Sequence, residues 1–530
     1  MKEIPTEMSG YPIGQQDFKQ LRTNGLIYVD KTSFIERMIK TKGQYYFLAR
    51  PRRFGKSLFL STIKYFFRGE RELFKGLFID SINWEWEKYP VLHLDFNTSR
   101  YQSPGMLEPV LDRLFRNWEE EYDVDVKDSD YSQRFSTIIK TAHERTGLPV
   151  VILVDEYDKP LVGNLNDTEI FEHYRSHLAS IYSNFKSSAE HIRLVFLTGV
   201  SRFSKLSVFS DLNNINDITF DNDFADVCGI TESEMLDYFS EGINELARRY
   251  NIEYSEACKL LKSNYDGYCF AEEGSDIYNP WSLLNAFSKR RMAYYWTMTG
   301  LPTIIAESLK RIDADLKRVV NTRCSMQTLS GMDLLSPNPI ALMYQTGYLT
   351  IKQYDYLSDM VSLGIPNREV EQGLFEVLLP YYVKVKRGLV ESVVNDLILD
   401  ILDGNPKEFM KNLDIFLAGI PYDMKMEDEN NFHNAMYILL TLIGIKAETE
   451  VHTSDGRIDL IIKTDKFIYI IELKLDKSSE SAMKQIEDKN YAYPYSSDSR
   501  QIFLIGANFS SETRHLDKPV IREIEGSCPI

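Results

Sequence analysis

The sequence predicts an α/β fold, with a parallel sheet in the N-terminal part of the chain and a second, smaller α/β domain at the C-terminal end. In the first 225 residues, short apolar runs alternate with stretches whose apolar residues recur at helical spacing, as in parallel-sheet proteins. Strand-like alternation returns from residue 447 onward, after a region rich in helical patterns. At about 150 residues per domain, the 530 residues allow three or four domains. We expect domains over residues 1–225, 226–420 and 421–530.

The charge and the cysteine content limit the possible functions. With 61 Lys and Arg against 78 Asp and Glu, the formal net charge is -17, so any contact with nucleic acid must use local basic patches. The five cysteines form no C-x-x-C pair, which favours a reducing compartment and weighs against a structural zinc site. The N-terminus lacks the apolar core of a signal peptide, and the longest apolar run is too short to span a bilayer. We therefore expect a cytoplasmic protein with no membrane partner.

A phosphate-binding signature with one replaced residue lies between the first expected strand and the first expected helix of the sheet. The strand is QYYFLA (44–49), the helix is SLFLSTIKYFF (57–67), and the segment between them reads RPRRFGK. The usual pattern G-x-x-x-x-G-K-[ST] has Arg50 in place of its first glycine. Taken alone, the segment is equally consistent with a helix that begins at the protein surface with GKS.

The other residues of the signature have the chemistry of a phosphate cradle. Gly55 lets backbone N–H groups at the helix start converge on an anion, Lys56 adds a positive charge, and Ser57 offers a magnesium ligand. Pro51 can pre-set the turn that the missing glycine normally permits. Three arginines are expected to make the loop strongly basic: Arg50, Arg52 and Arg53.

A pair of acids follows the apolar run LPVVILV (148–154). In nucleotide hydrolases, the first acid at such a strand end holds magnesium, and the glutamate after it polarises the attacking water. Asp155 and Glu156 occupy these two positions. An ordinary strand capped by acids is the alternative, but a continuous apolar run leading directly into two carboxylates favours the site.

Two further runs, residues 90–97 and 192–203, complete the expected parallel sheet. Thr198, near the end of the second run, is placed to sense the γ-phosphate of a nucleotide. Asn97 either orients the water near Glu156 or simply caps its strand. Arg202 is either an arginine finger, which a neighbouring copy of the chain would supply, or a solvated loop residue.

Several longer motifs resemble the predicted AAA-ATPase-like family, in which the phosphate loop also reads RPRRFGKS. The resemblance covers about the first 290 residues and implies a P-loop fold of the additional-catalytic-glutamate class, which is AAA+-like, with ATP and Mg²⁺ as cofactors. It also implies that the loop residues Arg52, Arg53, Phe54, Gly55, Lys56 and Ser57 bind the nucleotide. The motifs are YVDKTSFIERMI (28–39), RPRRFGKSLFLSTIKYFF (50–67), VDEYDKPL (154–161), TGVSRFSKLSVFSDLNNINDITF (198–220) and YNPWSLLNAF (278–287).

The middle of the chain contains helical patterns without a recognisable catalytic motif. SEMLDYFSEGINELARRY (233–250) has the apolar spacing of a core helix. ALMYQTGYLTIKQYD (341–355) passes from a helix-like run through Gly347 into strand-like alternation. A helical lid followed by a winged-helix-like element fits this region. Such an element binds DNA in some proteins and contacts other proteins in ATPases, and the sequence favours neither role.

The C-terminal quarter predicts a helix over residues 430–443 and three strands around AETEVH, GRIDLIIK and FIYIIELKL. Asp459 lies inside an apolar strand, and Glu472 and Lys474 alternate with apolar residues, so both face one side of the sheet. Charges in such a position are costly unless they are paired or bound to metal. The three residues either form ion pairs or make an oxygen site for Mg²⁺ or Mn²⁺ beside a cation.

The spacing from Asp459 to Glu472-Leu473-Lys474 and the surrounding text resemble the PD-(D/E)XK nuclease superfamily, with Ile458 where that family often has proline. The resemblance implies a restriction-endonuclease-like fold in which Asp459 and Glu472 bind the metal. Lys474 would position the water or stabilise the phosphorane, and Gln485 would support the site. His433 matches the family's position on the first helix, and Glu450 matches an outer metal ligand. A histidine satisfied within the core is an equal interpretation of His433.

These observations predict an ATPase coupled to a metal-dependent nuclease that cleaves nucleic acid, DNA more than RNA, with a homo-oligomer as a further expectation. One alternative is an ATP-driven switch whose C-terminal fold only binds nucleic acid or a partner. A second is a metal-dependent hydrolase of a small phosphoester. A serine hydrolase is disfavoured because the sequence contains no G-x-S-x-G.

Overall fold

The computed structural model describes most of the chain between residues 10 and 524, and the chain forms two compact units. The first unit comprises Met1–Trp296 and Asn321–Glu369, and the second comprises Thr297–Val320 and Val370–Ile530. The described residues are 10–101, 103–125, 130–164, 167–202, 215–296, 305–306, 308–309, 315–330, 338–383, 390–419, 429–444, 448–454 and 457–524.

The first unit is built on a five-stranded sheet in the order β2-β3-β4-β1-β5. Every neighbouring pair is parallel, which confirms the expected parallel α/β sheet. Strand β4 lies between β1 and β3, so the strand before the phosphate loop and the strand before the acid pair are not neighbours. The strands are β1 (Tyr45–Ala49), β2 (Val91–Asp95), β3 (Val150–Asp155), β4 (Ile192–Gly199) and β5 (Asn216–Asp217).

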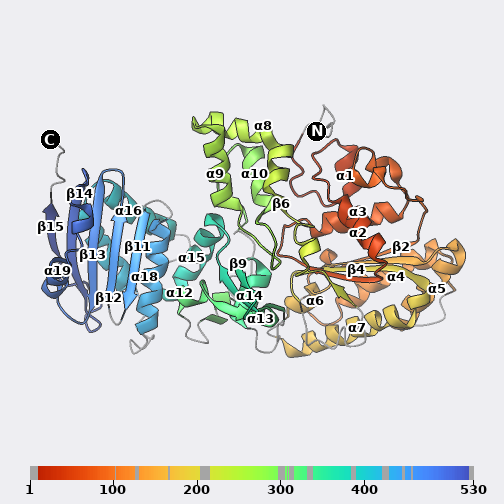
Figure 1. Ribbon diagram of the computed structural model, residues 1–530. Helices are drawn as coiled ribbons and strands as arrows, with labels where there is room; N and C mark the ends of the chain where they lie inside the picture. The colour runs from red at the N-terminus through yellow and green to blue at the C-terminus, as the bar shows by residue number, and fades with distance from the viewer. Residues whose placement is uncertain are drawn as a thin grey trace. The chain divides into compact units, whose positions relative to one another are not determined.

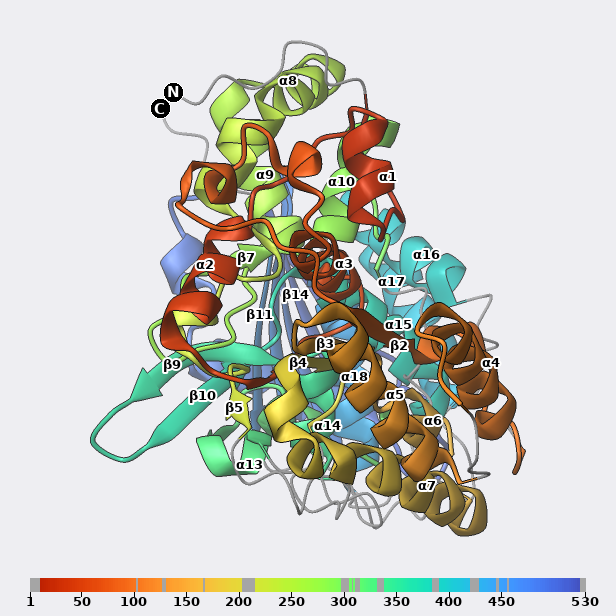
Figure 2. The same ribbon diagram turned by 90° about the vertical axis from the view of Figure 1, so that its right-hand side faces the viewer.

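Helices cover both faces of this sheet (Figures 1 and 2). Helix α3 packs on β2, β3 and β4 from one face, while α5 contacts β3 and lies with α7 on the opposite face. All residues of β1 and β3 are buried, as expected for strands that are apolar on both sides. The helices are α1 (Phe18–Thr23), α2 (Thr32–Thr41), α3 (Lys56–Phe67), α4 (Leu107–Glu121), α5 (Tyr131–Thr146), α6 (Lys159–Val162) and α7 (Thr168–Ser187).

A helical region follows the sheet, as expected for a lid. Helices α8 (Glu232–Tyr250), α9 (Tyr254–Tyr265) and α10 (Pro280–Lys289) share one apolar core, and β6 (Ile230–Thr231) pairs with β7 (Ile277–Tyr278). From the run 233–250 this core contains Met235, Phe239, Ile243 and Leu246, as the helical spacing predicted, whereas Leu236 and Tyr250 are exposed.

The expected winged-helix-like element is a helix followed by an antiparallel sheet. Helix α14 (Pro339–Thr346) ends at Gly347, whose φ of 89° gives the left-handed turn that glycine adopts most easily. The chain then forms the hairpin β9 (Thr350–Asp355) and β10 (Met360–Gly364). Strand β8 (Arg323–Ser325) pairs with β10, and α13 (Met326–Ser330) precedes α14.

The second unit contains a mixed five-stranded sheet in the order β11-β12-β13-β14-β15 (Figure 1). The three strands expected from the sequence are β11 (Glu448–Ser454), β12 (Arg457–Lys463) and β13 (Phe467–Leu475). Two more strands, β14 (Gln501–Phe509) and β15 (Val520–Ile524), were not expected. Helix α19 (Ser479–Asp488) connects β13 to its parallel neighbour β14. The other helices are α12 (Leu316–Val319), α15 (Arg368–Tyr382), α16 (Val390–Leu402), α17 (Pro406–Ala418) and α18 (Glu429–Gly444).

None of the helices in the described parts of the chain has the length and apolar character needed to cross a membrane. The cysteines in the same parts are free thiols: Cys228, Cys258, Cys269 and Cys324.

His93 of β2 makes the stability of the first unit depend on pH. Burial, and after it the charges of Lys64 and Arg68, lowers the pKa of His93 from 6.5 to about 3. Below pH 6.5 the unfolded chain therefore takes up a proton that the folded chain does not, so stability falls as the pH drops toward 3. Between pH 7 and pH 5, this proton uptake should lower the free energy of unfolding of the wild type by about 2 kcal/mol, and we expect His93→Leu to abolish that decrease. Melting curves of both proteins across this range measure the effect, and parallel pH profiles would contradict it.

Candidate functional site

The carboxyl ends of three parallel strands meet at one edge of the first sheet. Ala49 of β1 is opposite Gly199 of β4, and Val154 of β3 is opposite Leu197 of β4. The hydroxyl of Thr198 donates a hydrogen bond of 2.7 Å to Oδ1 of Asp155. Both side chains are buried, so Thr198 fixes the orientation of the carboxylate at the strand end.

The phosphate loop leads from β1 into α3 at this same edge. Gly55 caps the helix with a φ of 95°, a left-handed conformation that favours glycine. The ammonium of Lys56 is buried and donates to the carbonyl oxygens of Arg50 and Pro51, both at 2.9 Å. Burial lowers the pKa of Lys56, while Glu156 and then Asp155 oppose this shift. Lys56 follows β1, and the two carboxylates stand at the end of β3, so all three belong to the same edge of the sheet. Half-buried Ser57 lies in the first turn of α3.

Arg50, which replaces the first glycine of the signature, is a buried anchor. One terminal nitrogen of its guanidinium donates to the carbonyls of Ala49 and Thr219 at 3.0 and 2.6 Å. The other donates to the carbonyls of Phe224 and Ala225 at 3.1 and 3.4 Å. The guanidinium is 4.6 Å from the ring centre of an aromatic residue, Phe270, and Arg50 is only 1% exposed.

The expectation that three arginines make the loop strongly basic is wrong for Arg50, because its charge is enclosed by backbone carbonyls. Arg53 lies over the ring of Trp281 at 4.0 Å and donates to the carbonyl of Tyr295. Arg52 is half-buried. Among the three loop arginines, it is the one whose side chain makes no ion pair or ring contact with the described residues.

The buried ring of Phe54 packs edge-on against two aromatic rings of the lid, at 4.8 and 5.3 Å between ring centres. Those rings belong to Tyr268 and Phe270. Phe54 was expected to bind the nucleotide, and its packing gives it a role in holding the loop to the lid. Gly347 of the winged element also approaches the loop, because a Cβ at this position would lie 2.9 Å from Cβ of Pro51.

The second acid of the pair, Glu156, has a φ of 52°, which is sparsely populated for a residue with a side chain. Such conformations occur at functional sites that the surrounding structure holds in place. Its carboxylate is 3.5 Å from the ammonium of Lys159, which also donates to the carbonyl and the side-chain oxygen of Asn97. The structure therefore brings Glu156 and Asn97 together through Lys159, a residue that the sequence analysis missed although VDEYDKPL contains it.

Asp158 is another missed residue of this edge. Its buried Oδ2 accepts hydrogen bonds from the backbone N–H groups of Val200 and Ser201, at 3.1 and 2.7 Å. Burial raises the pKa of Asp158 to about 6, and Glu156 adds to the shift. These bonds hold the chain directly after β4 in position.

Arg202 is held within its own chain. Its guanidinium forms an ion pair with Asp217 of β5 and donates to the carbonyl of Ser330 at 3.3 Å, while its backbone N–H donates to Gln345 of α14. A role as a finger for a neighbouring copy would require this ion pair to break. The part of the motif that follows, residues 203–214, lies outside the described residues.

A mostly apolar pocket opens beside Gly55 and α3. Its walls come from the N-terminal segment, the phosphate loop with α3, and the lid, and they include Tyr28, Phe59, Ile230 and Leu284. Lys31 also lines the pocket and is tied to Glu234 and the carbonyl of Asp226 at 2.7 and 2.8 Å. Three segments far apart in the sequence form this pocket, so no single motif could have predicted it.

The second candidate site lies on the sheet of the second unit. The ladder between β12 and β13 pairs Asp459 with Glu472 and Arg457 with Lys474. The strands expected around GRIDLIIK and FIYIIELKL are therefore β12 and β13, which pair as an antiparallel hairpin. Residues opposite each other in such a ladder belong to one face of the sheet.

Helix α19 covers the face that carries Glu472 and Lys474. The ammonium of Lys474 donates to Oε1 of Gln485 on α19 at 2.8 Å. Gly506 of β14, opposite Glu472, allows the helix to approach, because a Cβ there would lie 2.5 Å from the backbone nitrogen of Met483. Glu472 is fully buried and Lys474 is 9% exposed.

Two buried polar atoms on α19, Oγ of Ser479 and Nε2 of Gln485, have no hydrogen-bond partner among the described residues. Orphaned polar atoms beside a buried carboxylate and an ammonium fit a site for an ion with its water. Three residues of the expected site have side chains outside the described part of the structure: His433, Glu450 and Asp459.

Arg50→Ala should destabilise the first unit by about 3 kcal/mol or more, because several buried carbonyls would lose a charged donor. Arg52→Ala is the matched control in the same loop and should cost less than about 1 kcal/mol. Thermal and urea unfolding of both variants measure the difference. Equal stability of the two variants would contradict the anchoring role of Arg50.

The comparisons with known proteins agree with this geometry. Residues 12–209 match the family described as Predicted AAA-ATPase, and residues 427–518 match the PD-(D/E)XK nuclease superfamily. A relative from Azotobacter chroococcum mcd 1, described as an uncharacterized protein in the vnfD 5' region, is 34% identical over 515 residues, or 95% of this chain and 97% of the relative. No solved structure matches the chain. Both resemblances are thereby confirmed, and the chain belongs to the predicted AAA-ATPase family, with a C-terminal domain of the PD-(D/E)XK nuclease superfamily.

Proposed function

We propose that the chain hydrolyses ATP and that this activity is coupled to a divalent-metal-dependent nuclease in its second unit. The observation that carries the first half is the meeting of Lys56, Asp155 and Glu156 at one sheet edge. The nuclease half is supported by the ladder that sets Asp459 opposite Glu472, with Lys474 two residues further on. A cytoplasmic location, a nucleic-acid partner (DNA more than RNA) and self-association belong to the same proposal.

At the nucleotide site, Lys56 would exchange its two loop carbonyls for the phosphate oxygens of ATP. Ser57 and Asp155 would hold Mg²⁺, which would neutralise phosphate charge, and Thr198 would keep Asp155 oriented. Glu156 would take the proton from the attacking water, with Asn97 and Lys159 beside it. The apolar pocket next to Gly55 would receive the flat base of the nucleotide.

At the nuclease-like site, Asp459 and Glu472 would hold Mg²⁺ or Mn²⁺, which would act as a Lewis acid on the scissile phosphate. Lys474 would hold its ammonium toward the developing negative charge, and Gln485 would fix the direction of that ammonium. Because Gln485 sits on α19 and Lys474 on β13, the packing of the helix on the sheet sets their geometry.

A nucleotide-driven switch without cleavage is the second candidate function, and the contacts of the winged element favour it. Gly347 touches the phosphate loop at Pro51, and Gln345 receives the backbone N–H of Arg202 after β4. The loop after β1 and the chain after β4 therefore both contact α14 or its C-terminal glycine. A conformational change of the phosphate loop on hydrolysis would be transmitted directly to this helix.

Lys56→Ala should weaken ATP binding by about tenfold or more, because a charge that contacts phosphate is lost. Glu156→Gln should keep binding and reduce hydrolysis by about 10²–10⁴, because only the proton acceptor is removed. Lys75→Ala changes an exposed lysine and should leave both properties intact. Nucleotide titrations and phosphate-release assays measure the two effects. Purified protein that neither binds nor hydrolyses ATP would contradict the proposal.

Asp459→Ala or Glu472→Ala should abolish nuclease activity through loss of the metal. Lys474→Ala should keep metal binding and reduce the cleavage rate by about 10²-fold or more, because its charge acts on the transition state. Glu487→Ala and Lys484→Ala alter exposed residues of the neighbouring helix and serve as matched controls. Ca²⁺ should bind without supporting turnover.

The assay compares single- and double-stranded DNA and RNA in Mg²⁺ and in Mn²⁺, with and without ATP. Equal residual cleavage by wild type and Glu472→Ala would identify a contaminant. No cleavage under any condition would leave the nucleotide-driven switch as the better proposal.

A further inference from the structure

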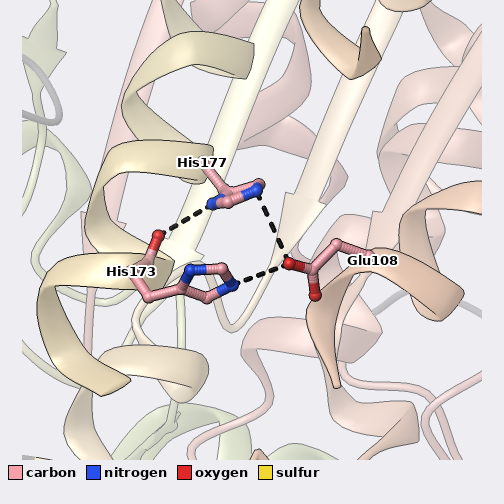
Figure 3. Close-up of side chains that lie close together, drawn as sticks. All are labelled: Glu108, His173 and His177. Atoms are coloured by element: carbon pink, nitrogen blue, oxygen red, sulfur yellow. Dashed lines mark hydrogen bonds and ion pairs between the residues drawn. The ribbon is translucent and has the colours of Figure 1, made fainter. Parts of the chain in front are cut away.

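Three side chains of metal-binding type meet between α4 and α7 of the first unit, and none of them is among the residues proposed for catalysis (Figure 3). Glu108 comes from the first turn of α4, and His173 and His177 lie one turn apart on α7. Oε1 of Glu108 is 2.7 Å from Nε2 of His173 and 3.5 Å from Nε2 of His177. One ligand atom from each residue falls within 4.8 Å of the other two.

The hydrogen bonding of His177 directs a lone pair toward Glu108. Its Nδ1 is 2.9 Å from the carbonyl oxygen of His173, and a carbonyl can only accept, so Nδ1 carries the proton. In the neutral ring, Nε2 is then an acceptor that faces a carboxylate oxygen. Two acceptors that face each other are stabilised by a cation between them, either a metal ion or the proton that converts the ring into an imidazolium. A backbone carbonyl bound to the far ring nitrogen is the usual support of a metal-ligating histidine.

The carboxylate of Glu108 also has an oxygen that is free to bind a cation. Its second oxygen, Oε2, is buried and has no hydrogen-bond partner among the described residues. The nearby hydroxyl of Tyr131 donates to the backbone carbonyl of Glu108 at 3.2 Å and does not serve the carboxylate. A buried carboxylate oxygen without a donor is costly unless a cation is bound beside it.

We propose that Glu108, His173 and His177 bind a zinc-class divalent cation, with a fourth coordination position left for water. Two imidazole nitrogens and one carboxylate suit Zn²⁺, whereas Mg²⁺ and Ca²⁺ prefer oxygen ligands. The three side chains are between 23 and 35% exposed, so an ion can enter from solvent. The missing C-x-x-C pairs that weighed against structural zinc do not bear on a site made of histidine and glutamate. The H-x-x-x-H spacing of 173–177 places both histidines on one face of α7, but the sequence analysis did not single it out.

The ion would join two helices that neighbour the nucleotide edge. Tyr174, between the two histidines, donates its hydroxyl to the carbonyl of Ser103, and its ring meets Tyr101 edge-on with 5.8 Å between centres. Asn164 donates to the carbonyl of Tyr101 at 2.6 Å. A cation at Glu108 would therefore fasten the start of α4 to α7, next to the chain that leads from Asn97.

The test uses the full chain, freed of metal with a chelator and kept in excess Mg²⁺ to fill oxygen sites. Co²⁺ is the spectroscopic probe, and Zn²⁺ is the competitor. The Glu472→Ala background removes a metal ligand proposed for the second unit. We expect one Co²⁺ per chain with visible absorption, displacement by Zn²⁺, and a rise of several degrees in melting temperature when Zn²⁺ is added.

Glu108→Gln and His177→Gln should each weaken Co²⁺ binding by about 100-fold and abolish the thermal shift. Glu172→Gln, an exposed residue of α7, and His191→Gln, outside the cluster, are the matched controls and should bind as the wild type does. Circular dichroism of the metal-free proteins separates lost binding from lost folding. The proposal is overturned if the wild type takes up no Co²⁺ or Zn²⁺, or if both cluster variants still bind; in either case Glu108 and the histidines form only an ion pair.

Discussion

The parallel pairing of β4 with both β1 and β3 sets the position of each group at the nucleotide site. Because this register makes three strands end at one level, the phosphate loop, the acid pair and Thr198 all leave the sheet at one edge. The strands are apolar and buried on both faces, so a slipped register would disrupt the packing of their side chains against the helices on either side and is disfavoured. The polar residues of the site lie where these buried strands end.

The second unit also brings the polar residues of its candidate site together on a sheet, but this sheet is mixed and not all parallel. An antiparallel ladder sets Asp459 opposite Glu472, and a parallel neighbour with Gly506 lets α19 approach closely enough for Gln485 to hold Lys474. Buried charge is tolerated there because the helix supplies polar partners and covers the face. Both units thus place costly polar groups on apolar sheets, where water is excluded and electrostatic interactions are strong.

Local patterns in the sequence predicted four of the five strands of the first sheet, the phosphate loop, the acid pair and the strands within 457–475, because each depends on periodicity or spacing over a few residues. The two-residue strand β5 is too short to give such a pattern and was not predicted. These patterns did not predict what Arg50 does, since three of its four carbonyl partners lie 169 to 175 residues further on. The apolar pocket beside Gly55 and the group around Glu108 were missed for the same reason, as their members come from separate elements. Strands β14 and β15 were missed because neither carries a recognised motif.

The hydrogen bond between Arg50 and the carbonyl of Thr219 has a consequence for folding during translation. At about 5–20 residues per second, a ribosome needs roughly ten to thirty seconds to make the 169 residues that separate them. During that interval the guanidinium has the carbonyl of Ala49 but lacks its three distant carbonyl partners. The full anchor of the phosphate loop therefore forms only after β2, β3 and β4 have been made, and a chain truncated before residue 219 would lack those three partners.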